Sequence, residues 1–488
     1  MNGAEGPQTG ARVRPADDLH DHVLFVRRRA ADSDRVAATA AIAKRTAELL
    51  DRTGSGLRLE GAPLDGLDLR GFDLRGAVLN RASLHGTRLD GALLAGASLI
   101  CPGLERTSFV RASLAGAYVH AFAAQVCDFS GADLSGLSDA TGALFHGCKL
   151  TGASLEGSNL SGTSFYQSIL DGASLARANL QACAFTESSC VGTRFEGASV
   201  DQASFTRTDL RGADLRGAAG EGVVIQRPLC AEGLLLDGAR LPGLRMAQVN
   251  AARVSARQLA ARESEWRRCG LPALAAAQAD LSGSTWSDVV LHGADLRGAS
   301  LDGARWTRVL ADRADLCDAK GENMSIVDSS AAGLSARGFQ ARCWTVRNSD
   351  LTGADLAGAY LYRAMISGDP PSSMRLAGAN LEEAVLVQAY VAADLSGASL
   401  RHLAGAYARM NQCRLVEASL RGARLFQASL VKVDVRGADL RGIEPPLFAD
   451  RCPGLAEAVE AAGEAGAPLG RYLAELGGAL AGVRGGST

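Results

Sequence analysis

Histidine, cysteine and carboxylate residues could support catalysis or metal binding in this sequence, but their spacing favours neither. The seven histidines are scattered, at positions 20, 22, 85, 120, 146, 292 and 402. Residues such as His85 and His120 follow a large apolar residue by one place, where the repeat described below faces water. No phosphate-binding loop, HExxH, GxSxG or GxGxxG sequence is present. We therefore predict that the protein is not an enzyme and has no catalytic residue, cofactor or metal ligand.

The eleven cysteines are dispersed along the chain without a CxxC pair, which argues against a zinc or redox site. Four occupy a position that alanine usually holds in the repeat: Cys127, Cys148, Cys183 and Cys413. Cys190 and Cys230 stand where the repeat has its large apolar residue. We expect reduced cysteines that fill small volumes in the core.

One segment suggests a contact surface. Residues 366–374 read Ile-Ser-Gly-Asp-Pro-Pro-Ser-Ser-Met, and a proline stands where the repeat expects a large inward residue. Proline cannot donate to a strand ladder, so we expect an exposed loop. An exposed loop rimmed by tyrosine and arginine is typical of a binding site; the alternative is a tolerated loop with incidental neighbours. The candidate contact residues are Asp369, Pro370, Pro371, Tyr362 and Arg363.

The elements that must position these residues are revealed by a period of five. Large apolar residues recur at every fifth position, and the bulkiest recur every twenty residues. Neither an α-helix nor a β-strand produces this period, and self-similarity at a fixed period indicates a solenoid. Four pentads per coil would stack the bulky residues in columns on one side. The predicted core columns are Phe145, Phe165, Phe185 and Phe205, and Trp286, Trp306, Ile326, Val346, Ile366 and Leu386.

The pentads share a template, shown by Gly-Ala-Asp-Leu-Arg at 212–216 and 293–297. We call its large apolar residue the centre. The centre and the small residue two places before it point inward, because they alone are consistently apolar. Close packing leaves the second inward position little more room than a methyl group needs. The other three positions face water, and glycine suits the corners because it tolerates positive φ.

Residues 131–135, 353–356 and 378–381 resemble the consensus Ala-(Asp/Asn)-Leu-x-x of the pentapeptide-repeat family as they stand. The resemblance implies a right-handed quadrilateral β-helix with four pentads per coil. The predicted fold class is therefore an all-β solenoid in two stretches, with helical N-terminal, middle and C-terminal elements.

The chain divides into five predicted segments, of which the two solenoids carry the pentads. One residue is gained between Leu134 and Phe145, and one is lost between Leu386 and Leu395. Small residues at the expected centres within 311–346 predict narrow or distorted coils. The segments are a tail and helical cap (1–56), a first solenoid (57–239), a basic interruption with a helix at 255–269 (240–279), a second solenoid (280–442) and a C-terminal helical cap (443–488). Whether the solenoids are continuous or hinged at 240–279 stays open.

The charge balance predicts a protein that binds neither nucleic acid nor membrane. The net charge is −2, from 51 basic and 53 acidic residues, so no bulk electrostatic attraction is expected. No apolar run is long enough for a membrane span, and no signal segment is evident. We expect a cytoplasmic, bacterial protein.

Two functions remain in view, both non-enzymatic. The family resemblance implies a DNA mimic that binds type II topoisomerase (gyrase) and gives resistance to its poisons. That role needs an acidic stripe, whereas residues 53–239 carry 14 basic and 19 acidic residues, and Asp209 and Asp295 each precede an arginine by two places. We favour a rigid protein–protein interaction scaffold with a partner of unknown identity. Its apolar stripe from Leu469 to Val483 would either seal the last coil or form a homodimer.

Overall fold

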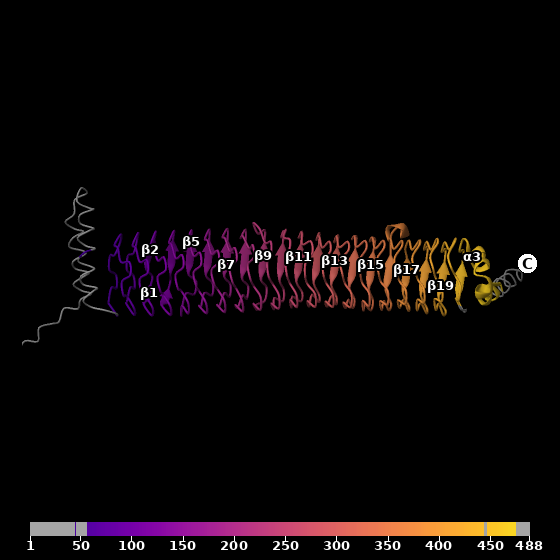
Figure 1. Cartoon of the computed structure of the whole chain (residues 1–488), viewed down its shortest axis with the longest axis horizontal. Coiled ribbons are helices and arrows are strands. Elements are labelled where there is room, and N and C mark those ends of the chain that lie inside the picture. The colour runs from indigo at the N-terminus through magenta and orange to yellow at the C-terminus, as the bar shows by residue number, and fades with distance from the viewer. Residues whose placement is uncertain (1–43, 45–55, 444–446, 475–488) are drawn as a thin grey trace, which may run out of the picture. The chain divides into compact units, whose positions relative to one another are not determined.

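The computed structural model describes residue 44 and residues 56–443 and 447–474, in two compact units. The first unit reaches Asp214 and the second begins at Leu215. Each unit is a β-solenoid built of stacked coils (Figure 1). The N-terminal tail and helical cap predicted over 1–56 lie almost wholly outside the described residues, so they stay a prediction.

In the first unit, residues twenty apart bridge in parallel, as Ser154 does with Ser174, so one coil takes four pentads. Its longest contacts form short strands in which only the middle side chain is buried. These strands are β1 (Ser98–Ile100), β2 (Gly103–Glu105), β3 (Tyr118–His120), β4 (Ala123–Gln125), β5 (Leu144–His146), β6 (Ser164–Tyr166), β7 (Ala184–Thr186) and β8 (Ser204–Thr206). β1 pairs with β3, and β2 begins a parallel ladder through β4 to β8.

In the second unit a parallel ladder runs from β9 to β20, one strand per coil. The strands are β9 (Val224–Gln226), β10 (Arg245–Ala247), β11 (Glu265–Arg267), β12 (Thr285–Ser287), β13 (Arg305–Thr307), β14 (Ser325–Val327), β15 (Thr345–Arg347), β16 (Met365–Ser367), β17 (Tyr390–Ala392), β18 (Arg409–Asn411), β19 (Ser429–Val431) and β20 (Phe448–Asp450). The helices are the 3₁₀ segments η2 (Pro371–Ser373) and η3 (Gly463–Gly466) and the α-helix α3 (Leu455–Ala461), and residues 467–474 are helical.

The phenylalanine column forms the core of the strand-bearing side in the first unit. Phe145, Phe165, Phe185 and Phe205 are fully buried. Their rings lie nearly parallel, with centroids 5.0, 4.9 and 4.8 Å apart in succession. The stacking follows from the ladder register, which places each ring directly over its counterpart in the neighbouring coil.

The predicted helical interruption at 240–279 is wrong: these residues form regular coils that include β10 and β11. The two inward positions of the pentad exchange their contents here, so that the centre is small and the earlier position is large. The buried pairs are Val249 with Ala251, Val254 with Ala256, and Leu259 with Ala261. The inward volume is kept, but the large residue moves two places along the chain, which obscures the period of five.

The same exchange overturns the prediction of narrow or distorted coils at 311–346. Leu334 and Phe339 fill the earlier inward position beside Ala336 and Ala341, and all four are buried. A Cβ atom added to Gly321 would lie 2.5 Å from Cζ of Phe339. The phenyl ring therefore occupies the volume that a side chain at this centre would take, so the coil is filled.

Changes in register mark where residues are gained or lost. Ala123 pairs with Leu144, one place beyond the regular offset of a coil, which confirms the residue gained between Leu134 and Phe145. Tyr390 pairs with Arg409, one place short of that offset, which confirms the lost residue.

A second inserted residue near Leu229, which is 71% exposed, escaped the sequence analysis. Val224 therefore pairs with Arg245, again one place beyond the regular offset. Because of the shift, the side chains of Leu234 and Leu236 are buried, while Cys230 is only partly buried and does not stand at a centre.

The tryptophan column also differs from the prediction. Trp266 joins it, with its ring 4.4 Å from that of Trp286 and parallel to it. After Ile366 the column continues to Val391, which pairs with Ile366, and not to Leu386. The loop after β16 lengthens this coil, so Leu386 lies on a different side from Ile366.

The described part of the C-terminal segment lies against the last coils. The Val435 amide donates to the Pro453 carbonyl (2.9 Å) and the Gly442 amide to that of Ala465 (3.3 Å). Leu469, the first residue of the predicted apolar stripe, is buried. Among the described residues, no helix combines the length and apolar character required to cross a membrane.

Candidate interaction site

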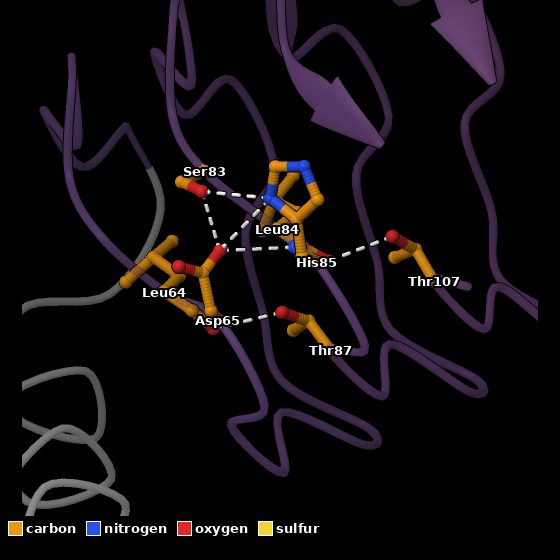
Figure 2. A network of polar contacts seen from close by, with 7 residues as sticks. All are labelled: Leu64, Asp65, Ser83, Leu84, His85, Thr87 and Thr107. Carbon is orange, nitrogen blue, oxygen red and sulfur yellow. Dashed lines mark hydrogen bonds and ion pairs between the residues drawn. The ribbon is translucent and has the colours of Figure 1, made fainter. Parts of the chain in front are cut away.

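A serine, a histidine and an aspartate meet in the first unit, but not in a catalytic arrangement (Figure 2). Asp65 Oδ1 accepts a hydrogen bond from Ser83 Oγ at 2.5 Å and lies 3.3 Å from His85 Nδ1. Ser83 Oγ is 2.9 Å from the same ring nitrogen. A catalytic triad needs the aspartate and the nucleophile on opposite ring nitrogens. The group instead links neighbouring coils, since Asp65 also accepts the His85 amide (3.0 Å).

The described residues contain no group of three or more histidine, cysteine or acidic side chains placed to hold a metal ion. All eleven cysteines are unpaired thiols. Burial raises the pKa of Cys183 to about 12, which suppresses its thiolate and hence its reactivity. Only Cys101 and Cys343 are exposed, both at corners with positive φ.

The predicted loop leaves the coil directly after β16 and stands out beside β17 in Figure 1. Asn348 Oδ1 anchors it by accepting hydrogen bonds from the Asp369 amide (2.9 Å) and Ser373 Oγ (3.0 Å). Ser373 Oγ also lies 2.7 Å from the Pro370 carbonyl. A Cβ atom at Gly368 would lie 2.5 Å from Ser373 Oγ, so the tight entry requires glycine. The loop is thus held in one arrangement, with Asp369 and Pro370 exposed.

Tyr362 and Arg363 are fixed by a shared acceptor. Gln388 Oε1 accepts hydrogen bonds from the Tyr362 hydroxyl (3.0 Å) and from Arg363 Nε (2.8 Å). The Tyr362 ring lies 5.3 Å from Cζ of Arg363 and 5.8 Å from that of Arg342, both within cation–π range. These contacts hold two long side chains in place at an exposed corner.

The five candidate residues do not form a single cluster. Tyr362 and Arg363 precede β16, whereas Asp369, Pro370 and Pro371 follow it. The strand between them spans about 10 Å. Between the two groups lies the flat ladder of β15 to β18, which we call the strand side.

The strand side exposes residues that the sequence analysis did not select. Met365 in β16 is 51% exposed, and Tyr390 in β17, beside it in the ladder, is partly exposed. Both stand one place before a centre, which is an outward position. In the sequence, Met365 could have been recognised as an apolar residue at a position that the repeat turns outward.

Several aspartates one place before the centre are clamped by an arginine two residues later, whereas others, such as Asp128 and Asp280, bond to a serine there. Arg297 donates to Asp295 through Nε and Nη2, each at 2.8 Å, and through its amide at 3.2 Å. Arg75 makes the same bonds to Asp73 and lowers the pKa of that carboxyl to about 2. The other described clamps of this form are Asp68–Arg70, Asp209–Arg211, Asp434–Arg436 and Asp439–Arg441. Charge is therefore balanced locally.

Carboxylates of the first unit are also distributed around the coil. In its first coil Glu60, Asp65, Asp68 and Asp73 adjoin four successive centres, one on each side. The arginines of 240–275 are distributed likewise, because that stretch forms coils and not one basic helix. Neither charge forms a continuous stripe there.

A stack of pentad coils linked by parallel ladders places the protein in the β-solenoid class. The family model "pentapeptide repeats" matches in eight copies, over residues 58–96, 127–167, 141–177, 188–219, 277–310 and 406–442. The chain is a pentapeptide-repeat protein.

Solved structures of the same kind are similar to this one. They include full-length QnrB1, a plasmid-mediated fluoroquinolone resistance protein, with 14% identity, a TM-score of 0.29 and coverage of 50% of this chain and 99% of QnrB1. HetL from Nostoc sp. strain PCC 7120, which is involved in heterocyst differentiation regulation, shows 20% identity, a TM-score of 0.16 and coverage of 71% and 93%. A thylakoid-lumen protein of Arabidopsis thaliana shows 23% identity, a TM-score of 0.10 and coverage of 26% and 66%. No curated protein sequence matches.

Proposed function

We propose that this protein is a non-enzymatic scaffold that binds a protein partner on the strand side. The observation that carries the proposal is the exposed Met365, beside Tyr390, on a flat ladder with the anchored loop at one edge and Tyr362 and Arg363 at the other. Tyrosine, methionine and arginine are enriched at the centres of interfaces. Apolar side chains gathered on an otherwise polar surface mark interaction sites.

The partner is recognised by side chains and not by strand addition. The backbone amides on this side already bond to neighbouring coils: that of Met365 donates to Trp344 (2.7 Å) and that of Tyr390 to Ala364 (2.8 Å). A partner therefore gains no backbone ladder here. Its affinity comes from covering Met365 and Tyr390 and from polar bonds to the two edges.

The test uses a photo-crosslinking residue at position 367, on the strand side, followed by mass spectrometry. Met365→Asp should abolish the crosslinked partner, because a charge would replace the central apolar contact. The matched control is Ser325→Asp, at the equivalent outward position of β14. A partner that survives Met365→Asp, or that Ser325→Asp removes equally, would contradict the proposed site.

Mimicry of DNA towards type II topoisomerase is the alternative that the family resemblance raised. It needs a continuous acidic stripe, whereas several aspartates here, such as Asp209, are clamped by arginines, and the carboxylates of the first coil lie on all four sides. We therefore expect neither inhibition nor poison protection in a gyrase supercoiling assay at micromolar protein. Protection that is lost in Asp209→Asn would promote this alternative to first place.

A further inference from the structure

We propose that two copies of this chain pair face to face, in antiparallel orientation, through the side that precedes the strand side in each coil. We call it the apolar side. Its outward residues form five consecutive rows, because Gln340, Tyr360, Val385, Ala404 and Arg424 bridge one another in that order. The second member of each row stands two places later: Arg342, Tyr362, Val387, Ala406 and Phe426. The inference goes beyond the proposed function, which centres on Met365 and Tyr390 of the strand side and shares only the edge residues Tyr362 and Arg363 with this side.

The apolar side exposes large apolar groups and, in these five rows, no carboxylate. Tyr360 is 40% exposed and Phe426 is 47% exposed, as is Tyr407 at the corner one place after Ala406. Earlier rows of the same side differ, since they carry Asp302 and Glu322. A contiguous apolar patch exposed on the surface of a solenoid marks an interaction site.

The order of side-chain sizes identifies that partner as a second copy. The three central rows run from two tyrosines, through two valines, to two alanines. A two-fold axis through the valine row, parallel to the strands, places the tyrosine row of each copy on the alanine row of the other. Such reciprocal contact is required of an isologous interface. Large rings then fit over small side chains, as close packing demands.

The same axis pairs arginines of these rows with aromatic rings, although Glu383, at the other corner of the valine row, faces its own copy. The axis places Arg342 over the ring of Phe426, and the corner residue Arg363 over that of Tyr407, which are favourable cation–π pairs. Arg424 faces Gln340, so no arginine meets another. A shift of one row would set Tyr362 against Phe426 and hold the smaller rows apart. A partner of different sequence would not require this reciprocal order.

The pairing is reversible. Five rows spaced about 4.8 Å apart cover roughly 20–25 Å of the side, so the contact is small and belongs with weak, transient associations. We expect a dissociation constant on the order of micromolar.

The decisive experiment exchanges the sizes of two facing residues in the full chain, with sedimentation velocity from about 1 to 100 μM as the measurement. Ala406→Tyr should reduce dimerisation at least tenfold, because two rings would then compete for one space. Tyr362→Ala combined with Ala406→Tyr should restore it, because the large and small residues are exchanged on both copies. A monomeric wild type, an undisturbed Ala406→Tyr variant or an unrestored double variant would overturn the proposal. Circular dichroism of each variant establishes that it is folded.

An independent readout uses Val387, which meets its own copy at the axis. Val387→Cys, in a chain whose exposed Cys101 and Cys343 are changed to serine, should form a disulfide-linked dimer under copper–phenanthroline oxidation. Val327→Cys, at an outward position of β14, is the matched control and should stay monomeric. A homodimer through the C-terminal stripe alone would persist in Ala406→Tyr and give no Val387→Cys crosslink, which would refute the pairing. Met365→Asp should leave the dimer intact, so failure of the scaffold proposal is recognised separately.

Discussion

Replacing Phe185 by alanine tests the core of the first unit most directly. Phe185 is fully buried between Phe165 and Phe205, with centroids 4.9 and 4.8 Å away, and it meets the edge of Phe195 at 5.6 Å. Removing a buried phenylalanine costs about 3–5 kcal/mol. The loss of three ring contacts places this site in the upper half of that range, at about 4–5 kcal/mol.

Native-state hydrogen exchange is the appropriate assay, because each coil of a solenoid contacts only its neighbours and opening is local. The amides of Ala184 and Ser204 donate to carbonyls of the preceding coil at 3.0 and 2.9 Å. Since about 1.4 kcal/mol corresponds to a factor of ten, these amides should exchange about a thousandfold faster in Phe185→Ala. The Ser300 amide, which bonds to Ala279 in the second unit, should be unaffected.

Thr186→Ala is the matched control, because Thr186 is the outward neighbour of Phe185 in β7. Its effect on the free energy of opening should be within about 0.5 kcal/mol. Acceleration below tenfold in Phe185→Ala, or equal acceleration in Thr186→Ala, would refute the assignment of the column as the main stabilising element.

Three further predictions concern coil filling, acid titration and thiols. Gly321→Ala should lower the free energy of unfolding by about 1–3 kcal/mol, because its Cβ would meet the Phe339 ring, and Phe339→Leu should recover part of the loss in denaturant titrations. The Arg75 clamp holds the folded pKa of Asp73 near 2, below its ordinary 3.8, so its stabilising contribution is present above about pH 4 and is lost as the pH falls towards 2; Arg75→Ala should return the pKa towards 3.8 in carbon-13 NMR titration, and an unchanged value would contradict the clamp. Ellman's reagent should label Cys101 and Cys343 rapidly, whereas buried thiols such as Cys183 should react only after unfolding; rapid reaction of more than five thiols in the native state would be incompatible with the core.

The coil could be predicted from the sequence, because a large apolar residue at every fifth position identifies the inward-facing positions. It also indicated the aspartate–arginine offset, which the structure shows as clamps at Asp209 and Asp295. The helix predicted at 255–269 failed because both inward positions accept either a large or a small residue. Packing constrains only the combined volume of the two inward side chains. Leu259 followed by Ala261 therefore fills the coil as well as the opposite order would.

Features that depend on register were not accessible from spacing alone. Leu234, Leu235 and Leu236 are consecutive, so apolarity could not distinguish the outward one. The rows of the apolar side could not be predicted from the sequence for a related reason. Successive members such as Tyr360, Val385 and Ala404 are unequally spaced along the chain, and only the ladder shows them to be neighbours.

A gained or lost residue changes the numbering of the pentads that follow it, but the register between neighbouring coils is restored within one coil. After the insertion between Leu134 and Phe145, the pentads up to the next insertion near Leu229 are displaced by one in numbering, yet each resumes its place over its counterpart because the preceding coil acts as the template. The place of a residue in the solenoid is thus set by its pairing with the preceding coil, not by its number in the sequence. Surface columns can therefore keep their pattern while the sequence between them lengthens or shortens. Any redesign of these surfaces has to be planned in columns, since a residue number alone does not say which way a side chain faces.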